Sequence, residues 1–449
     1  MADGRRSHNS SILEKKKSLN GNCLLGKTGV LLRVMKQIIL CVCAVGLSAF
    51  SLQADVVEWR GEGRKGIYPG EGLLQEWSDG EPKLLWCAEG IGTGYSSPII
   101  LADGIYTTAN GTAENEGKEL LVAMDKSGKI LWKTPYGTLS GNTQQYTGTR
   151  STPTFAGGRF YVVSSSGEAS CIDKKGTLLW SVNAAEEYKG VSGRWAWGTS
   201  ALVADGKVIF TIGGNEGTLL ALDAETGKKV WLSSPLEGTA AYVAPTIIEK
   251  GGKKQIVGMN AWFIFGVNPG TGEYEWKVDL RETPELYEGV RIKDITAVTP
   301  VLEGNLLVSS IGYNIGTFAI RLNDALNEAK LEWFNKDLDS QHHGIVVTKD
   351  TVWGMSARGN FCALDLQTGK TRYCEKLCKG MIIAAGESFY CYDEKEGKVF
   401  LVEMNTTQLT KRGEFTMTAG AQQHWAHPVI DSDILYIRHG DALAAYSLK

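Results

Sequence analysis

The sequence predicts an all-β protein, an eight-bladed β-propeller whose blades are four-stranded antiparallel sheets. Three observations favour this class. The chain holds 54 glycines in 449 residues, well above the usual share of about 7%, so tight turns are frequent. A short segment that ends in an aromatic residue recurs every 40 to 57 residues. Eight apolar segments that begin with small residues or proline alternate with these, and short strands with such a period are typical of propeller blades.

The first 54 residues are expected to lie outside the propeller. From Met35 a short basic start precedes an apolar run from Ile38 to Phe50, and small residues precede Asp55. This pattern is typical of a secretory signal peptide, and the apolar run is too short to span a bilayer. We therefore expect an N-terminal extension and signal peptide over residues 1–54, cleaved near Ala54, and a mature protein that is periplasmic or secreted and has no transmembrane span. Translation from the first methionine and translation from the second one both fit this pattern.

Residues 55–449 are expected to form one domain built from the repeat. The clearest copies are Asp223–Trp231 and Asp365–Tyr373, in which an aspartate starts a turn, a glycine closes it and an aromatic residue follows. Aspartate accepts backbone hydrogen bonds in turns, and glycine takes the positive φ that other residues resist. Each copy therefore predicts a hairpin between the third and outermost strands of a blade, with the aromatic residue packed on the neighbouring blade. The aromatic ends are Trp86, Trp132, Trp180, Trp231, Trp276, Trp333 and Tyr373, and a further copy that ends at Thr410 is degenerate.

The last copy, from Pro428 to Lys449, contains three expected strands instead of four. The free segment Lys83–Trp86 is expected to supply the fourth, so that an N-terminal strand around Trp86 closes the ring. Closure removes the exposed sheet edges through which propeller blades would otherwise aggregate. We expect the protein to be a monomer.

The residues just before each innermost strand are expected to line the mouth of the central channel, where ligands of propellers bind. Aromatic faces with Arg150 and Lys379 suit a planar anion such as a quinone, or a sugar. His343 and His427 suit a general base or metal ligands, although no metal site is predicted. The alternative is that these polar residues only satisfy backbone groups and ordered water. The ligand-binding candidates are Tyr95, Arg150, Trp195, Trp197, Tyr242, Gln341, His342, His343, Lys379, His424, Trp425 and His427.

The Asp-x-x-Thr-Gly-x-x-x-aromatic copies resemble the repeats of the pyrroloquinoline-quinone (PQQ) propeller superfamily, and the resemblance covers Val57 to Lys449. The stretches Trp59–Gly61 and Gly92–Pro98 resemble its PQQ-binding-like, BamB-like subgroup. The superfamily includes quinoprotein alcohol dehydrogenases and a non-catalytic lipoprotein that assists outer-membrane barrel assembly. The resemblance therefore implies the propeller fold together with either a PQQ- and calcium-dependent activity or a role in binding.

The sequence lacks several features of the dehydrogenases: two adjacent cysteines, long insertions and a haem-attachment motif. Our leading hypothesis is an exported periplasmic binding or scaffold module that acts through its axial face, with an envelope protein, a glycan or a small molecule as partner and no firmly predicted cofactor. The alternative is an alcohol or sugar dehydrogenase that uses PQQ and calcium, and a hydrolase that uses the mouth histidines is a third hypothesis. The net charge of −3 and the lack of a basic cluster exclude nucleic acid as a partner.

Six cysteines follow residue 54. Cys362 and Cys374 flank the expected turn at Leu366–Gly369, so they could face each other across two strands and pair in an oxidising compartment. The alternative is that both are small buried strand residues. No spacing of cysteine and histidine indicates structural zinc or c-type haem.

Overall fold

A computed structural model describes residues 55–78, 82–141, 146–283 and 295–449. The expected signal peptide lies outside these described residues. Within them, helices are too short or too polar to cross a membrane. The short helices are η1 (Glu62–Arg64), η2 (Ala113–Asn115), α2 (Ala184–Glu187) and η4 (Leu280–Glu282).

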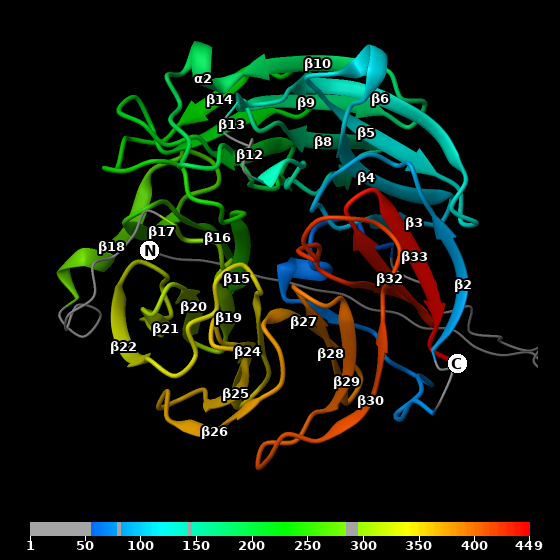
Figure 1. Ribbon diagram of the computed structural model, residues 1–449. Helices are drawn as coiled ribbons and strands as arrows, with labels where there is room; N and C mark the ends of the chain where they lie inside the picture. Colours follow the sequence, from blue (N-terminus) through cyan, green and yellow to red (C-terminus); the bar gives the residue numbers. More distant parts are fainter. Residues whose placement is uncertain (1–54, 79–81, 142–145, 284–294) are drawn as a thin grey trace, which may run out of the picture. The chain divides into compact units, whose positions relative to one another are not determined.

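The described residues form eight sheets, which are the blades of an all-β propeller, so the predicted fold class is confirmed (Figure 1). In each blade the chain runs from the axis outward through antiparallel neighbours. Blades one to four consist of β3 (Ile99–Leu101), β4 (Gly104–Asn110), β5 (Lys118–Met124) and β6 (Ile130–Thr138); β7 (Thr154–Ala156), β8 (Arg159–Val163), β9 (Glu168–Asp173) and β10 (Leu178–Asn183); β11 (Leu202–Ala204), β12 (Lys207–Thr211), β13 (Leu219–Asp223) and β14 (Lys229–Leu232); and β15 (Thr246–Lys250), β16 (Lys253–Met259), β17 (Phe263–Val267) and β18 (Tyr274–Asp279).

The second half of the ring repeats this plan with two additions from the N-terminal segment. Blades five to eight consist of β19 (Val301–Glu303), β20 (Leu306–Ile311), β21 (Gly316–Leu322) and β22 (Ala329–Asn335); β23 (Ile345–Val347), β24 (Thr351–Met355), β25 (Asn360–Asp365) and β26 (Thr371–Lys376); β27 (Gly380–Ala385), β28 (Ser388–Asp393), β29 (Lys398–Glu403) and β30 (Lys411–Thr416); and β31 (Val429–Asp431), β32 (Ile434–His439) and β33 (Ala442–Ser447). The eighth blade takes its fourth strand from β2 (Lys83–Ala88), in which Trp86 lies opposite Ala445. The expected pairing of this segment is therefore present, and that it closes the ring stays a prediction.

The seventh blade differs from the expected plan because it has five strands. β1 (Ile67–Tyr68) adds to it in parallel, with Ile67 opposite Ala384 on the axial side of β27. β1 ends a stretch, residues 56–68, that we call the axial segment. It makes backbone hydrogen bonds with β3 through Val56 and with β7 through Val57. Since it contacts the innermost strands of blades on different sides of the ring, the axial segment lies in the central channel.

Five of the repeat aromatics lie against a hairpin glycine of the next blade, namely Trp86, Trp132, Trp180, Trp231 and Trp333, whereas Trp276 packs within its own blade and donates to Gln255. The indole of Trp231 in the third blade covers Gly272 of the fourth, so closely that a Cβ there would come 2.6 Å from the ring. Gly272 has a φ of +78°, which glycine adopts without strain. The Trp231 Nε1 also donates a hydrogen bond to the carbonyl of Pro269 at 3.1 Å. Trp180 repeats both contacts one blade earlier, over Gly227 and with the carbonyl of Ala224.

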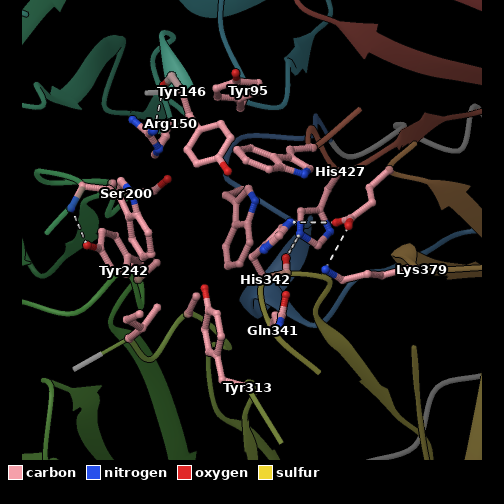
Figure 2. A pocket seen from close by; sticks show the side chains of 18 residues that line it. Tyr95, Tyr146, Arg150, Ser200, Tyr242, Tyr313, Gln341, His342, Lys379 and His427 are labelled. Carbon is pink, nitrogen blue, oxygen red and sulfur yellow. Dashed lines mark hydrogen bonds and ion pairs between the residues drawn. The ribbon is translucent and has the colours of Figure 1, made fainter. Parts of the chain in front are cut away.

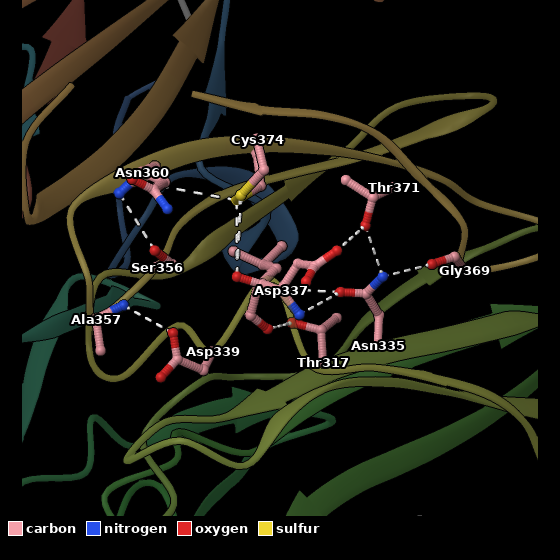
Figure 3. The surroundings of a disulfide bond; sticks show 12 residues. Thr317, Asn335, Asp337, Asp339, Ser356, Ala357, Asn360, Gly369, Thr371 and Cys374 are labelled. Atoms are coloured by element: carbon pink, nitrogen blue, oxygen red, sulfur yellow. Dashed lines mark hydrogen bonds between the residues drawn. A yellow bond between two sulfur atoms is a disulfide. The ribbon is translucent and has the colours of Figure 1, made fainter. Parts of the chain in front are cut away.

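The cysteines that flank the sixth hairpin form a disulfide. Cys362 of β25 lies directly opposite Cys374 of β26, and the two are bonded (Figure 3). Of the two alternatives left open by the sequence, the structure thus has the disulfide. The other cysteines of the described residues, Cys87, Cys171, Cys378 and Cys391, carry free thiols.

Candidate functional site

A cavity of about 480 Å³ lies on the propeller axis, against the axial segment. Residues just before the innermost strand of every blade contribute to it, which is where the sequence placed the channel mouth (Figure 2). The lining residues are Trp59, Tyr95, Tyr146, Arg150, Trp195, Gly198, Ser200, Tyr242, Ala244, Ile295, Ala297, Tyr313, Gln341, His342, Lys379, Glu394, Trp425 and His427.

Nine of the twelve candidate residues named from the sequence line this cavity: Tyr95, Arg150, Trp195, Tyr242, Gln341, His342, Lys379, Trp425 and His427. The other three point elsewhere. Trp197 is buried between the second and third blades, where its ring covers Gly167. His343 is fully buried behind the wall, and His424 stacks on His439 with ring centroids 3.5 Å apart. That the nine bind a ligand stays a prediction.

Tryptophan and tyrosine rings form a large part of the cavity wall. Trp425 is the centre of one group, with ring centroids 4.9 Å from Tyr146, 5.0 Å from Tyr95 and 5.2 Å from His342. On another part of the wall the Tyr242 hydroxyl accepts a hydrogen bond from the backbone N–H of Trp195. The indole Nε1 atoms of Trp195 and Trp425 are buried and have no acceptor among the described residues. The wall therefore combines flat apolar faces with two buried N–H donors that no described acceptor satisfies.

Arg150 brings a positive charge into this aromatic wall. Its guanidinium lies 5.7 Å from the centre of the Tyr95 ring and donates to the carbonyls of Tyr146 and Gly148. Burial lowers the pKa of Arg150 from its ordinary value, since the charged form is less well solvated there. Desolvation raises the pKa of Tyr95 to about 12, so its hydroxyl is neutral. A buried guanidinium held in this way is suited to a carboxylate or an oxygen-rich ligand.

A second charged group lies between the sixth and seventh blades. The Glu394 carboxylate accepts from Lys379 Nζ at 2.9 Å and lies 3.3 Å from His343 Nε2 and 3.5 Å from His342 Nε2. Burial opposes ionisation of Glu394, but the two imidazoles outweigh it and hold its pKa well below the ordinary value. Burial also lowers the pKa of His343 to about 4, so that this ring is neutral near pH 7. Glu394 therefore stays ionised beside a neutral histidine.

Arg60 of the axial segment holds part of the cavity wall in place. Its guanidinium donates to the carbonyls of Ile345 and Ile382, at 2.6 and 2.9 Å, and to His427 Nδ1 at 2.9 Å. Because Nδ1 accepts, the proton of a neutral His427 ring is on Nε2, which donates to the carbonyl of His342. Burial, with the charge of Arg60, holds the pKa of His427 well below its ordinary value. Both nitrogens are engaged, which leaves neither for the role of base or metal ligand considered from the sequence.

Nine of the eighteen lining residues were not among the twelve candidates, and the clearest misses are Trp59, Ile295, Tyr313 and Glu394. Tyr313 lies in the turn between β20 and β21, and Glu394 in the turn between β28 and β29. In these two blades the turn between the second and third strands thus faces the cavity. The spacing of the repeat could have predicted these turns as lining segments. Trp59 comes from the axial segment, and Ile295 lies two residues before the expected position of its blade.

Comparisons with known proteins bear on the family and the fold. The sequence model of the family described as outer membrane protein assembly factor BamB matches residues 117–373. The crystal structure of BamB from Moraxella catarrhalis superposes with a TM-score of 0.57 at 16% identity, over 81% of this chain and 99% of that one. The quinohemoprotein alcohol dehydrogenase from Comamonas testosteroni gives 0.65 at 13% identity, over 92% and 84%.

A computationally designed protein, Ika8, is also similar, with a TM-score of 0.52 at 12% identity over 81% of this chain and 99% of that one. No curated protein sequence matches the chain. At these identities the structures support the eight-bladed fold alone.

Proposed function

The chain belongs to the propeller family described as outer membrane protein assembly factor BamB, and from that premise we propose that it is an exported binding or scaffold module. Its axial cavity is the binding site, and its ligand is a small carbohydrate or the sugar end of a glycan. Export is supported by the sequence of residues 1–54 and by the Cys362–Cys374 disulfide, which an oxidising compartment favours.

The observation that carries this proposal is the composition of the cavity wall. Seven of its side chains are aromatic: Trp59, Tyr95, Tyr146, Trp195, Tyr242, Tyr313 and Trp425. Flat rings offer contact area to the C–H faces of a pyranose, while a few polar groups fix its orientation. Gln341, which lines the cavity, supplies both a donor and an acceptor for hydroxyl groups. Arg150 favours a sugar that carries a carboxylate.

The same residues are a poor fit for the PQQ and calcium of the dehydrogenase alternative. Calcium takes about six to eight oxygen ligands. Glu394 is the one carboxylate among the described lining residues, and Lys379 and two histidines already face its oxygens. Arg150 alone would hold the quinone's carboxylates, because Lys379 is committed to Glu394. The donor set therefore favours binding over quinone-dependent oxidation.

The proposal is tested by titrating the purified protein with maltose, cellobiose and glucuronate, followed by calorimetry and by tryptophan fluorescence. We expect at least one sugar to bind and to change the fluorescence of the cavity tryptophans, and Trp425→Leu to weaken it at least about tenfold, since aromatic contacts contribute about 1 kcal/mol or more. PQQ with Ca²⁺ is the comparison probe and is expected not to bind stoichiometrically.

The matched control is Trp262→Leu, because Trp262 is a half-buried tryptophan outside the cavity that contacts Arg281. Equal weakening by both substitutions would place the sugar elsewhere. Stoichiometric uptake of PQQ and Ca²⁺ with alcohol turnover would replace the binding proposal by the dehydrogenase alternative, and absence of binding by a wide range of glycans would end the carbohydrate proposal.

A further inference from the structure

Two histidines and a glutamate converge on one wall of the axial cavity. His342 and His343 precede β23 of the sixth blade, and Glu394 follows β28 of the seventh. Each residue offers one ligand atom, a ring nitrogen from each histidine and a carboxylate oxygen from Glu394. These three atoms lie within 4.8 Å of one another. Both Nε2 atoms face the same carboxylate oxygen, Oε2 of Glu394, at 3.5 and 3.3 Å. Residues from neighbouring blades thus bring three metal-ligating atoms together.

Two of the three separations match the edges of a zinc coordination tetrahedron, and all three ligand atoms lie within 4.8 Å of one another. With Zn–N and Zn–O bonds of about 2.0–2.2 Å, two ligand atoms of a tetrahedral site lie about 3.3–3.5 Å apart. The two edges from Glu394 Oε2 have this length. The contact between His343 Nε2 and Glu394 is a hydrogen bond of 3.3 Å, longer than a charge-assisted bond of about 2.7–2.9 Å. The Nε2 of His342 is moreover buried and makes no hydrogen bond among the described residues.

Lys379 orients the carboxylate without occupying the shared position. Its ammonium lies 2.9 Å from the other oxygen of Glu394, Oε1. A donor on one oxygen of a ligating carboxylate is a common outer-shell arrangement, since it fixes the rotation of the group. The ring of His343 is fully buried, whereas His342 is about a third exposed and lines the cavity with Glu394. A fourth coordination position would therefore face the cavity.

We propose that His342, His343 and Glu394 form a binding site for a zinc-class divalent cation, with its open position toward the axial cavity. Two histidines and one carboxylate are a ligand set that zinc uses where a position is kept for water or a ligand. The site takes a cavity ligand through an oxygen atom, which adds a direct bond to the aromatic contacts. It does not depend on the carbohydrate proposal, because the cation binds the empty protein.

The test is a Zn²⁺ titration of the purified full chain after chelation and dialysis, with a chromophoric chelator as competitor and no sugar present. We expect one equivalent of Zn²⁺, and Co²⁺ in its place to give the visible absorption of a tetrahedral site. Glu394→Gln and His342→Gln are expected to weaken binding more than about 100-fold, because loss of an outer-shell partner alone costs about 10–100-fold. Lys379→Met is expected to weaken Zn²⁺ binding by only about 10–100-fold, because Lys379 contacts the carboxylate and not the cation.

His424→Gln is the matched control, since His424 is a buried histidine on the same face that lies outside the three-residue cluster. The His424→Gln variant should bind Zn²⁺ with the affinity of the unchanged protein. Circular dichroism shows whether each variant is folded. Binding of less than about a tenth of an equivalent overturns the proposal, and so does binding that survives in folded Glu394→Gln and His342→Gln. Neither result affects a sugar titration, so the two proposals fail separately.

Discussion

The rim and the axis of this propeller are held together in different ways. At the rim one contact is repeated around the ring: an indole of one blade covers the hairpin glycine of the next, as in Trp180 over Gly227 and Trp333 over Gly369. At the axis the contacts of the axial segment occur once. Arg60 of this segment joins the sixth, seventh and eighth blades, through Ile345, Ile382 and His427.

The difference suggests that the rim contacts serve mainly the stability of the fold and the axial contacts mainly the specificity of binding. A repeated contact can be lost at one interface while the other interfaces keep theirs, so rim residues are expected to act locally and alike. Single-copy contacts give each position of the axial ring a different side chain, which is what a site for one ligand needs. Substitutions in the two regions can therefore test whether the division holds.

The largest effect is expected at the rim from Trp231→Ala. Removing a buried tryptophan costs about 3–5 kcal/mol of the free energy of unfolding, and the lost hydrogen bond to Pro269 is part of that cost. Chemical denaturation measures it. Trp333→Ala is the control for repetition and is expected to cost a similar amount, because its indole covers Gly369 and donates to Leu366 in the same way. A difference of several kcal/mol between the two would contradict the equivalence of rim contacts.

A smaller effect is expected at the axis from Arg60→Met, which keeps an unbranched apolar side chain but removes the guanidinium. Its hydrogen bonds to Ile345, Ile382 and His427 disappear, and so does a longer one to the carbonyl of Lys65. Each is worth about 1.5–3 kcal/mol, but the penalty of burying the charge disappears as well. We expect a net loss of about 2–3 kcal/mol. The control is Arg64→Met, whose guanidinium donates to the carbonyls of Ser200 and Ala201 in the third blade and pairs with Glu58 of the axial segment.

Ligand binding makes the axial comparison sharper. Arg60→Met frees Nδ1 of His427, which lines the cavity, so the affinity for a cavity ligand is expected to fall. Arg64 does not line the cavity and reaches it only through the backbone carbonyl of Ser200, so Arg64→Met should change that affinity less. Equal affinities in both variants would show that the axial segment only stabilises the ring.

The sequence predicted the rim well because its information is local. Asp223 and Gly227 in one short segment are enough to place a turn, and copies of the segment confirm one another. The eight innermost strands follow from the same spacing, and so does the position of nine of the cavity residues. The disulfide of Cys362 and Cys374 was one of two alternatives, since its register depends on the hairpin turn between them.

The axis was predicted less well because its contacts are single and long-range. Nothing near Trp59 or Arg60 in the sequence indicates that they reach strands about 300 residues further on, and no second copy supports the assignment. Glu394 was missed for a related reason, because it lies in a turn that varies from blade to blade. Its partners, His342 and His343, were found only through their place before a strand. The sequence also did not predict which side chains point into the cavity. Trp195 lines it, whereas Trp197, two residues further on, is buried between blades.

The smallest effect is expected from Asp223→Asn at a rim hairpin. The Asp223 carboxylate accepts from the hydroxyl and N–H of Thr226, and these hydrogen bonds lower its pKa below the ordinary 3.8. A carboxyl with a lowered pKa in the folded state contributes stability above its unfolded value, and loses it as the pH falls below 3.8 and through the folded value. Asparagine keeps the acceptor but does not titrate, as Asn268 shows in the fourth blade, where it accepts from Gly270 and Thr271.

Asp223→Asn is therefore expected to leave the unfolding free energy near pH 7 almost unchanged and to reduce its decline under acid, measured by denaturation from about pH 5 to about pH 3. The reverse change, Asn268→Asp, should add the same decline to the fourth blade. If the two substitutions shift the acid dependence in opposite directions by similar amounts, the hairpins are interchangeable units, as repetition at the rim requires. If only one substitution shifts the acid dependence, the surroundings of the two hairpins differ. The rim contacts would then be specific to each blade, as the contacts of the axial segment are.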